Sequence, residues 1–262
     1  MNQVKFGIQL YSVRNQLNAD FRGTLAKLAA MGFQGVEFAF YYGEMKPEDL
    51  AMLVKELQLN VYGIYERFQN LCDSEHIVYD YAAAMGCSYL TGGLGAQLEK
   101  DYASCVEKAG KACSVASKHG LTICYHAHAQ EFKKVDGVCL LDRLLADIPE
   151  MRLEPDTAWI HLGGQNVLEH MEKHAARIPL IHAKDVTADG KITELGKGVI
   201  DFAAVLQFAQ AHNIEWLIYE QDGEEDLDPV ENALMSIDFL KSISSCGRKK
   251  SQPKTAKITR SR

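Results

Sequence analysis

The sequence has no long apolar run, no pair of cysteines spaced as CxxC and no linker rich in glycine and serine. The N-terminal segment MNQVKFGIQLYSVR is too polar for a signal peptide, and no later segment approaches the about 20 apolar residues of a transmembrane helix. Most of the seven cysteines lie in apolar periodic segments, which indicates buried thiols. We therefore expect a protein of the reduced cytoplasm that does not span a membrane.

Positive charge is scarce in the body of the chain. The formal net charge is −7, but seven basic residues and no acidic residue follow Cys246, which leaves −14 for residues 1–247. A body this acidic repels phosphate backbones, and this argues against nucleic acid as a partner. We expect residues 1–245 to form the folded domain and residues 246–262 to form a basic, disordered and solvated tail.

The length and composition suit one large folded domain. Hydrophobic residues make up 47% of the 262 residues and charged residues 24%, which is ordinary for a globular protein. An α/β barrel takes about 250 residues, so a single barrel accommodates the chain. The glycine-rich segment 92–95 does not continue as a GxGxxG or Walker pattern, so we interpret it as a flexible loop.

Short runs of β-branched and aromatic residues alternate with amphipathic stretches, and the alternation repeats eight times. The predicted strands are Val4–Leu10, Gly35–Ala39, Asn60–Tyr65, Ser88–Gly92, Leu121–His126, Arg152–Asp156, Leu180–Lys184 and Trp216–Glu220. The predicted helices lie near Phe21–Met31, Pro47–Leu57, Glu75–Met85, Tyr102–His119, Val138–Ile148, Val167–Arg177, Phe202–His212 and Pro229–Ile243. Strict alternation predicts parallel strands, and eight units favour a closed (β/α)8 TIM barrel of the α/β class. A doubly wound open sheet is the alternative.

Polar residues stand at or just after the ends of the predicted strands, where such barrels carry their reactive groups. His126, Asp156, His182 and Glu220 mark the ends of four consecutive strands, so they are expected to converge on one divalent metal ion. A nitrogen and oxygen set without thiolate suits Mn²⁺ best, with Co²⁺, Mg²⁺ and Zn²⁺ as alternatives. Each residue alone has a structural explanation as a buried polar group at a barrel rim, but four at one edge favour a metal site.

Several segments carry a family resemblance. They are QLYSVR (9–14), GVEFA (35–39), YHAHAQEF (125–132), DTAW (156–159), HAKD (182–185), LGKGVIDF (195–202) and YEQD (219–222). Together they resemble the xylose-isomerase-like barrel superfamily, and within it the branch of sugar phosphate isomerases/epimerases and inosose dehydratases. The resemblance extends to about Ser242 and implies the same fold and the same four metal ligands.

Two positions depart from the pattern of that family. The related ketose epimerases have a catalytic glutamate where His126 stands, so Glu131 is a candidate to take over a nearby role. Many relatives have His-Asn-His where this chain has Ala127 in the centre, which removes one possible hydrogen bond to a substrate.

The predicted function is that of an isomerase or epimerase which moves a proton on a small sugar or sugar phosphate through a metal-stabilised enediolate. We expect Glu220 or Glu131 to abstract the proton, provided that burial raises the carboxylate pKa toward neutrality, and Lys184 to protonate or stabilise an oxyanion. The predicted substrate-binding residues are Gln9, Tyr11, Arg14, Glu37, His128, Trp159 and Asp185.

Other functions stay open at this point. A lyase that dehydrates an inosose or a 3-keto sugar would use the same intermediate. An AP endonuclease-like nuclease conflicts with the acidic body of the chain, and a non-catalytic sugar-binding barrel would bind without turnover. The sequence predicts a small-molecule partner and no membrane, and it leaves the sugar, its phosphorylation, the native metal and a homo-oligomer undecided.

Overall fold

The computed structural model describes residues 3–223 and 228–250, the last five as main chain only. Eight strands form one parallel sheet in the order β8-β5-β4-β3-β2-β1-β12-β9. Their bounds are β1 Lys5–Gln9, β2 Gly35–Ala39, β3 Asn60–Tyr65, β4 Tyr89–Gly92, β5 Thr122–His126, β8 Arg152–Glu154, β9 Leu180–Ala183 and β12 Trp216–Tyr219. A single bridge between Asp156 and His182 joins the two edges. The predicted TIM barrel is confirmed, and the open sheet is wrong.

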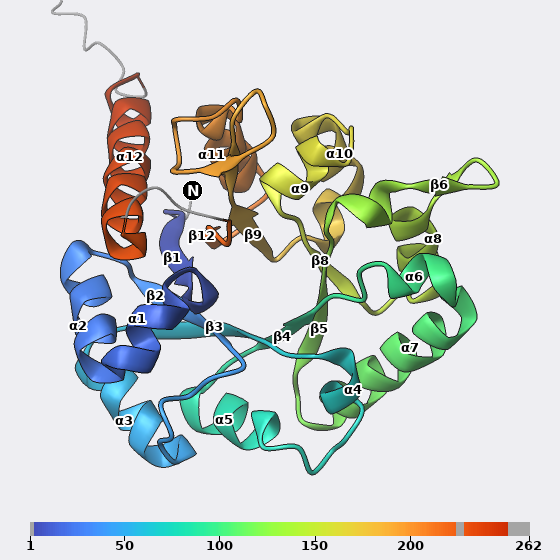
Figure 1. The fold of residues 1–262 in the computed structure, drawn as a ribbon, viewed down its shortest axis with the longest axis horizontal. Helices are drawn as coiled ribbons and strands as arrows, with labels where there is room; N and C mark the ends of the chain where they lie inside the picture. The colour runs from blue at the N-terminus through green and yellow to red at the C-terminus, as the bar shows by residue number, and fades with distance from the viewer. Residues whose placement is uncertain (1–2, 224–227, 251–262) are drawn as a thin grey trace, which may run out of the picture.

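Helices surround the ring of strands, as Figure 1 shows. The long ones are α2 Phe21–Met31, α3 Pro47–Glu56, α5 Val78–Met85, α7 Tyr102–Lys118, α8 Leu140–Asp147, α10 Val167–His174, α11 Phe202–Ala211 and α12 Pro229–Lys250. Each overlaps a predicted helix. Helix α12 ends inside the segment predicted as a tail, and residues 251–262 lie outside the described residues.

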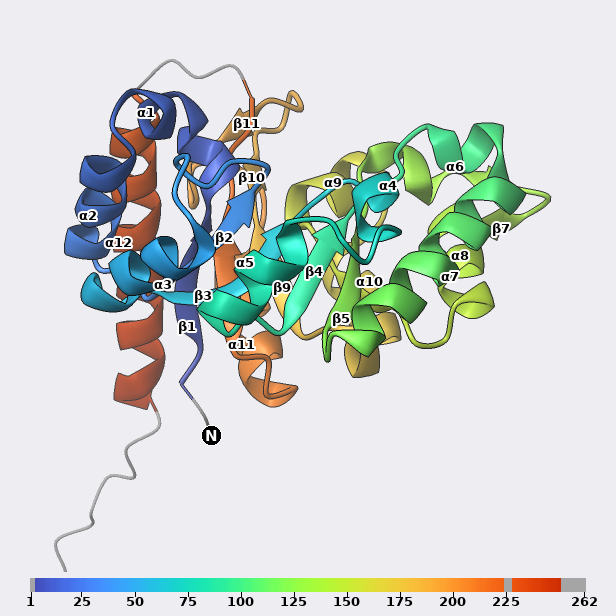
Figure 2. The same ribbon diagram turned by 90° about the horizontal axis from the view of Figure 1, so that it is seen from below.

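Short elements in the connections were not predicted, because they are too brief for hydrophobic periodicity. The helical ones are α1 Arg14–Ala19, α4 Phe68–Leu71, α6 Gln97–Lys100, α9 Thr157–Leu162, and the 3-10 helices η1 Leu10–Val13, η2 Ala129–Phe132 and η3 Ala175–Arg177. Two hairpins complete the set: β6 Lys134–Val135 with β7 Val138–Cys139, and β10 Asp185–Val186 with β11 Ile192–Thr193. In Figure 2, α1, α4 and the β10–β11 hairpin lie toward one end of the barrel and the N-terminus toward the other.

Local signals in the sequence set the helix ends. The side chain of Asp20 accepts a hydrogen bond from the Gly23 N–H and so caps the start of α2, and Asp201 does the same for α11. Helix α2 stops at Gly32, whose φ of 95° only glycine adopts without strain. The N-cap residues fix where a crossover helix begins after one strand, and the C-cap glycine fixes where the helix ends before the next strand.

Alternation along the strands places a large apolar cluster between the strands and the helices and a second, small one inside the barrel. On β2, Val36 and Phe38 are buried among the helices, while Glu37 between them points to the barrel interior. A small cluster fills the interior near the N-terminal ends of the strands and consists of Tyr62, Leu180, Trp216 and Ile218, with Tyr89 packed against it. The interior is therefore apolar at one end and polar at the other.

Two further findings concern the described part of the chain. The six cysteines whose side chains it describes are free thiols, four of them buried, as expected. None of its helices combines the length and the apolar character that crossing a membrane requires.

Candidate metal centre

Four buried side chains meet at the C-terminal ends of neighbouring strands. His126 ends β5, Asp156 follows β8, His182 lies in β9 and Glu220 follows β12. One nitrogen or oxygen atom from each lies within 4.8 Å of those of the others. The predicted convergence of these four residues is therefore present in the structure, and two imidazoles with two carboxylates form a donor set that divalent transition metals accept.

The protonation of His126 and the orientation of Asp156 both favour binding of a cation. Burial lowers the pKa of His126 well below its usual value, which keeps the ring in the neutral form that binds metals, and its buried Nδ1 makes no hydrogen bond. Asp156 is the N-cap of α9, where its Oδ1 accepts hydrogen bonds from the N–H groups of Ala158 and Trp159 at 2.9 and 3.0 Å. This cap orients the carboxylate and leaves Oδ2 directed into the cluster.

His182 lies between carboxylates on both sides of its ring. Its Nδ1 is 2.8 Å from Glu220 Oε2, and its Nε2 is 2.7 Å from Glu37 Oε2 and 3.2 Å from Glu154 Oε1. Burial disfavours the charged ring, but the three carboxylates outweigh it and raise the pKa of His182 well above its usual value. Burial and the neighbouring Glu154 raise the pKa of Glu37 to about 7. Glu37, predicted to bind substrate, instead contacts a metal-ligand candidate.

Lys184 supplies a buried positive charge beside the cluster. Its Nζ lies 3.0 Å from Asp156 Oδ2, 3.1 Å from Glu220 Oε2 and 3.0 Å from Asp222 Oδ1. Burial by itself would raise the pKa of Glu220, but Lys184 and His182 lower it well below the usual range. The condition set for Glu220 as the proton acceptor, a pKa raised toward neutrality, is therefore not met, because the carboxylate is held ionised.

Glu131, the alternative proton acceptor, supports two loops. Its Oε1 accepts hydrogen bonds from the Gly95 N–H at 2.9 Å and from the Tyr125 hydroxyl at 3.0 Å, and its Oε2 accepts one from the His128 N–H at 3.1 Å. Burial raises the pKa of Glu131. The carboxylate ties the loop after β4 to the loop after β5, and it does not line the pocket described below. The structure therefore does not support Glu131 as a catalytic base.

Asp185 also has a structural task. Its Oδ1 accepts hydrogen bonds from the N–H groups of Val186 and Ile200, and its Oδ2 accepts them from Gly196 and Gly198. Four main-chain donors satisfy this fully buried carboxylate and fix the segment 196–200 against β10. The structure does not support the substrate contact that was predicted for Asp185.

A pocket of about 250 Å³ opens beside the metal-ligand candidates. It is lined by Gln9, Tyr11, Ala39, Phe40, Tyr65, His126, His128, Glu220 and Asp222. Of the residues predicted to bind substrate, Gln9, Tyr11 and His128 are in this lining. Arg14 is outside it, with its guanidinium 4.4 Å from the centre of the Tyr11 ring and a hydrogen bond to the Tyr11 carbonyl. Trp159 is also outside the lining and packs against His128, with ring centres 5.4 Å apart.

Some residues of this site were missed at the level of the sequence. Glu154 stands two positions before Asp156, so the alternation of a β-strand already places both side chains on the barrel interior. Asp222, two positions after Glu220, was recognisable in the sequence as a polar residue at a strand end, and the structure shows that it pairs with Lys184 and lines the pocket. Phe40 follows β2 with φ of 60°, a conformation that no propensity rule assigns to phenylalanine. The strand signal could have found Glu154, whereas Phe40 needed the structure.

Comparisons with known proteins agree with this architecture. The chain is similar to the inosose dehydratase of Clostridium beijerinckii, with 24% identity over 270 residues that cover 84% of this chain and 89% of the relative. It is also similar to the solved sugar phosphate isomerase/epimerase of Parabacteroides distasonis, with a TM-score of 0.79 and 20% identity over 91% of this chain and 98% of that one. The solved IolI protein with a bound zinc atom matches with a TM-score of 0.73 and 13% identity over 93% and 99%.

The solved structures establish the fold alone at such identities, but a family comparison goes further. The family model described as xylose isomerase-like TIM barrel matches residues 25–243, which is most of the chain. The matched segment includes all four metal-ligand candidates and every strand of the sheet except β1. The chain therefore belongs to the xylose isomerase-like TIM barrel family.

Proposed function

We propose that this protein is a divalent-metal-dependent lyase that removes water from a cyclic polyhydroxy ketone of the inosose type. Relatives named inosose dehydratase support the substrate class. A sugar isomerase or epimerase, the function favoured by the sequence, is the second candidate, because solved neighbours bear those names. Both reactions begin with loss of a proton from the carbon next to a carbonyl group.

The position of Glu131 is the observation that carries this choice. Epimerisation removes a proton from one face of a carbon and returns one to the other face, so it uses an acid/base group on each side. The second carboxylate expected for that task is Glu131. It instead accepts three hydrogen bonds that hold two loops together. Dehydration requires one group to accept the α-proton and to protonate the leaving hydroxyl, and this is a smaller demand on the pocket.

In this proposal the metal ligands and His128 have different chemical roles. A divalent ion held by His126, Asp156, His182 and Glu220 would act as a Lewis acid on the substrate carbonyl. His128, an imidazole in the pocket lining, accepts the α-proton as the carbon–hydrogen bond breaks and then delivers it to the β-hydroxyl, which leaves as water.

Lys184 serves two roles in the same scheme. Its ammonium group keeps Glu220 ionised, which makes that carboxylate a good ligand and a weak base. The same positive charge lies next to Glu220 and Asp222 of the pocket lining, where it would stabilise negative charge that develops on the substrate oxygen.

The test is turnover of an inosose by the full chain in the presence of Mn²⁺ or Zn²⁺. We expect a product that absorbs as an α,β-unsaturated ketone or diketone, and we expect His128→Asn to abolish turnover while metal binding persists. An epimer or isomer that retains all substrate oxygens would replace the lyase with the second candidate. Binding without turnover, unchanged in Glu220→Gln, would instead identify a sugar-binding barrel.

Three properties stay predictions. We propose a small sugar-like partner and no nucleic acid, and nicking of abasic DNA would contradict this. Mn²⁺ is the ion we expect at the cluster, although a solved neighbour carries zinc. The third is a cytoplasmic location.

A further inference from the structure

Two carboxylates lie buried in the barrel axis next to the metal-ligand candidates. Glu37 of β2 and Glu154 of β8 are both 0% exposed. Glu37 Oε1 and both oxygens of Glu154 lack a well-aligned hydrogen bond. A Cβ added at Gly63 would lie only 3.1 Å from Glu37 Oε1, so the glycine gives this carboxylate room. The barrel is built to admit these two acidic groups.

Burial of these two carboxylates by itself lowers the stability of the fold. A buried carboxylate without a hydrogen bond or solvent loses several kcal/mol of hydration free energy. Apolar side chains of similar size, such as those in the cluster of Leu180 and Ile218, would fill the same space more cheaply. The two carboxylates therefore call for an explanation beyond packing.

The group that both carboxylates share is Nε2 of His182. Glu37 Oε2 lies 2.7 Å from it and Glu154 Oε1 lies 3.2 Å from it. The opposite nitrogen, Nδ1, is 2.8 Å from Glu220 and therefore faces the metal-ligand candidates. An imidazole that donates one N–H to a carboxylate keeps its other nitrogen free to bind a metal, and the carboxylate fixes the ring orientation.

We propose that Glu37 and Glu154 are positioning residues that hold a hydrogen on Nε2 of His182 and so direct its Nδ1 to the metal ion. Glu37 provides the short hydrogen bond, and Glu154 provides a second acceptor that restrains rotation of the ring. Neither carboxylate touches the substrate pocket, because neither is in its lining. The inference rests on the proposed metal centre, and it does not depend on whether the reaction is dehydration or isomerisation.

The tautomer can be measured directly by nitrogen NMR of the histidine rings in the full chain loaded with Zn²⁺. We expect His182 to carry its proton on Nε2 and to show a metal-shifted Nδ1. In Glu37→Leu we expect this proton signal to broaden or vanish. A wild-type His182 protonated on Nδ1, with Nε2 on the metal, would overturn the proposal without any variant.

Metal affinity gives a second readout by calorimetry with Zn²⁺ alone. We expect Glu37→Leu and Glu154→Leu to bind about 10- to 100-fold more weakly, the usual effect of losing such a partner. Glu37→Gln keeps an acceptor oxygen and should recover part of the loss, and it also serves if the leucine variant does not fold. The matched control is Glu131→Gln, another buried carboxylate with hydrogen-bond partners, which should retain wild-type affinity.

Two results would contradict the proposal. Unchanged Zn²⁺ affinity in folded Glu37→Leu and Glu154→Leu would show that the pair does not act on His182. Two Zn²⁺ ions per wild-type chain, falling to one in Glu154→Gln, would show that Glu37, Glu154 and His182 hold an ion of their own, as their ligand atoms within 4.8 Å of one another would permit. Because no substrate is used, neither result depends on the proposed reaction.

Discussion

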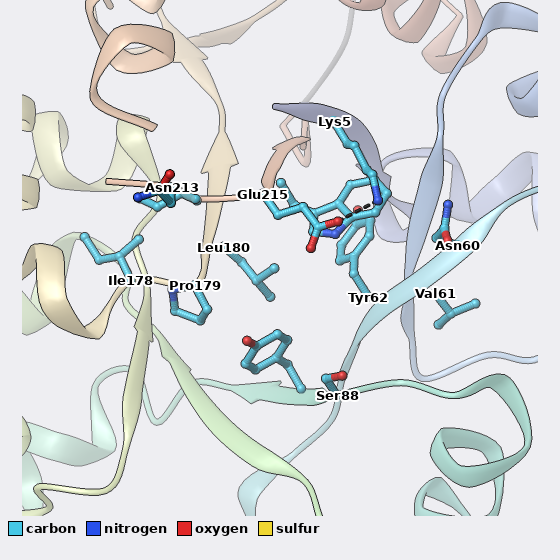
Figure 3. A pocket seen from close by; sticks show the side chains of 13 residues that line it. Lys5, Asn60, Val61, Tyr62, Ser88, Ile178, Pro179, Leu180, Asn213 and Glu215 are labelled. Carbon is cyan, nitrogen blue, oxygen red and sulfur yellow. Dashed lines mark hydrogen bonds and ion pairs between the residues drawn. The ribbon is translucent and has the colours of Figure 1, made fainter. Parts of the chain in front are cut away.

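The two ends of the barrel differ in how their polar groups are satisfied. Figure 3 shows the pocket at the N-terminal ends of the strands, where Lys5 pairs with Glu215 above Pro179 and Ser88. This pocket has a volume of about 370 Å³, larger than the about 250 Å³ at the opposite end. The side chains of Lys5 and Glu215 are 37% and 55% exposed, so water solvates both charges.

At the C-terminal ends of the strands the charges are buried. Lys184 is 0% exposed, and its partners are buried or largely so. Buried nitrogen and oxygen atoms of His126, Asp156 and Glu154 lack hydrogen bonds there. Cavity size therefore does not mark the functional end of this barrel, whereas the clustering of buried ionisable groups does.

The largest effect is expected from a comparison of the same substitution, Glu to Gln, just before and just after β12. Glu220→Gln removes a metal ligand, so we expect turnover to fall by about 10³-fold or more and metal affinity to fall with it. Glu215→Gln removes only an exposed ion pair with Lys5, so we expect a stability change below about 1 kcal/mol and unchanged activity. Steady-state kinetics and calorimetric metal titration measure both. Equal losses in the two variants would remove the distinction between the ends.

A second pair of variants compares the two lysines. Lys184→Met leaves Asp156, Glu220 and Asp222 without their buried cation, so we expect a loss of about 3–5 kcal/mol in the free energy of unfolding without metal. A divalent ion between Asp156 and Glu220 replaces part of that charge, so Mn²⁺ should raise the Tm of this variant more than that of the wild type.

Lys5→Met is the control for this experiment. Its ammonium group is partly exposed, pairs with Glu215 and lies 5.2 Å from the centre of the Trp216 ring, so we expect little change in stability and the same Mn²⁺ response as the wild type. Chemical unfolding with and without Mn²⁺ gives both quantities. A Mn²⁺ response in Lys184→Met no larger than that of the wild type would place the ion away from these carboxylates.

Part of the acid sensitivity of the fold should arise away from both ends. His170 on α10 lies against Phe132 and His174, and burial, then His174, lower its pKa to about 4. The unfolded state, with a pKa near 6.5, binds the proton more readily, so this contribution is complete above about pH 6.5 and is lost as the pH falls toward 4. The loss is on the order of 3 kcal/mol.

His170→Gln removes the titrating group, so we expect a flatter dependence of unfolding free energy on pH between about 6.5 and 4. Asp142, the carboxylate that raises the pKa of His170, and Lys173, which lowers it, stay in place in this variant. Urea unfolding across this pH range measures the slope. An unchanged slope would assign the acid sensitivity to other groups, with the buried imidazoles of the metal centre as the next to test.

The sequence alone predicted the strands well and the chemistry unevenly. Strand ends could be located because β-branched runs and glycine caps define them, and His126, Asp156, His182 and Glu220 follow from those ends. The roles of neighbouring polar residues could not be predicted from strand ends. Glu131 and Asp185 lie close in sequence to the ligands, but their carboxylates accept hydrogen bonds from the main chain of nearby loops.

The smallest expected effect concerns Phe40 in the wall of the pocket. Its ring is 42% exposed and packs edge-on against Tyr11 and Tyr65, while its φ of 60° is costly for a residue with a Cβ. Backbone strain kept at a pocket suggests that the ring contacts substrate. We expect Phe40→Ala and Phe40→Gly to raise KM several-fold with little change in kcat.

The two variants differ in strain, because glycine adopts this φ freely and alanine does not. Phe40→Gly should therefore be more stable than Phe40→Ala by about 1 kcal/mol in chemical unfolding, while both share the same KM. If both variants keep the wild-type KM, the Phe40 ring does not contact the substrate. A higher KM in both variants at similar kcat makes the Phe40 ring part of the substrate-binding surface. The apolar cluster at the N-terminal end cannot supply such a ring, because Tyr62 and Trp216 are packed against each other.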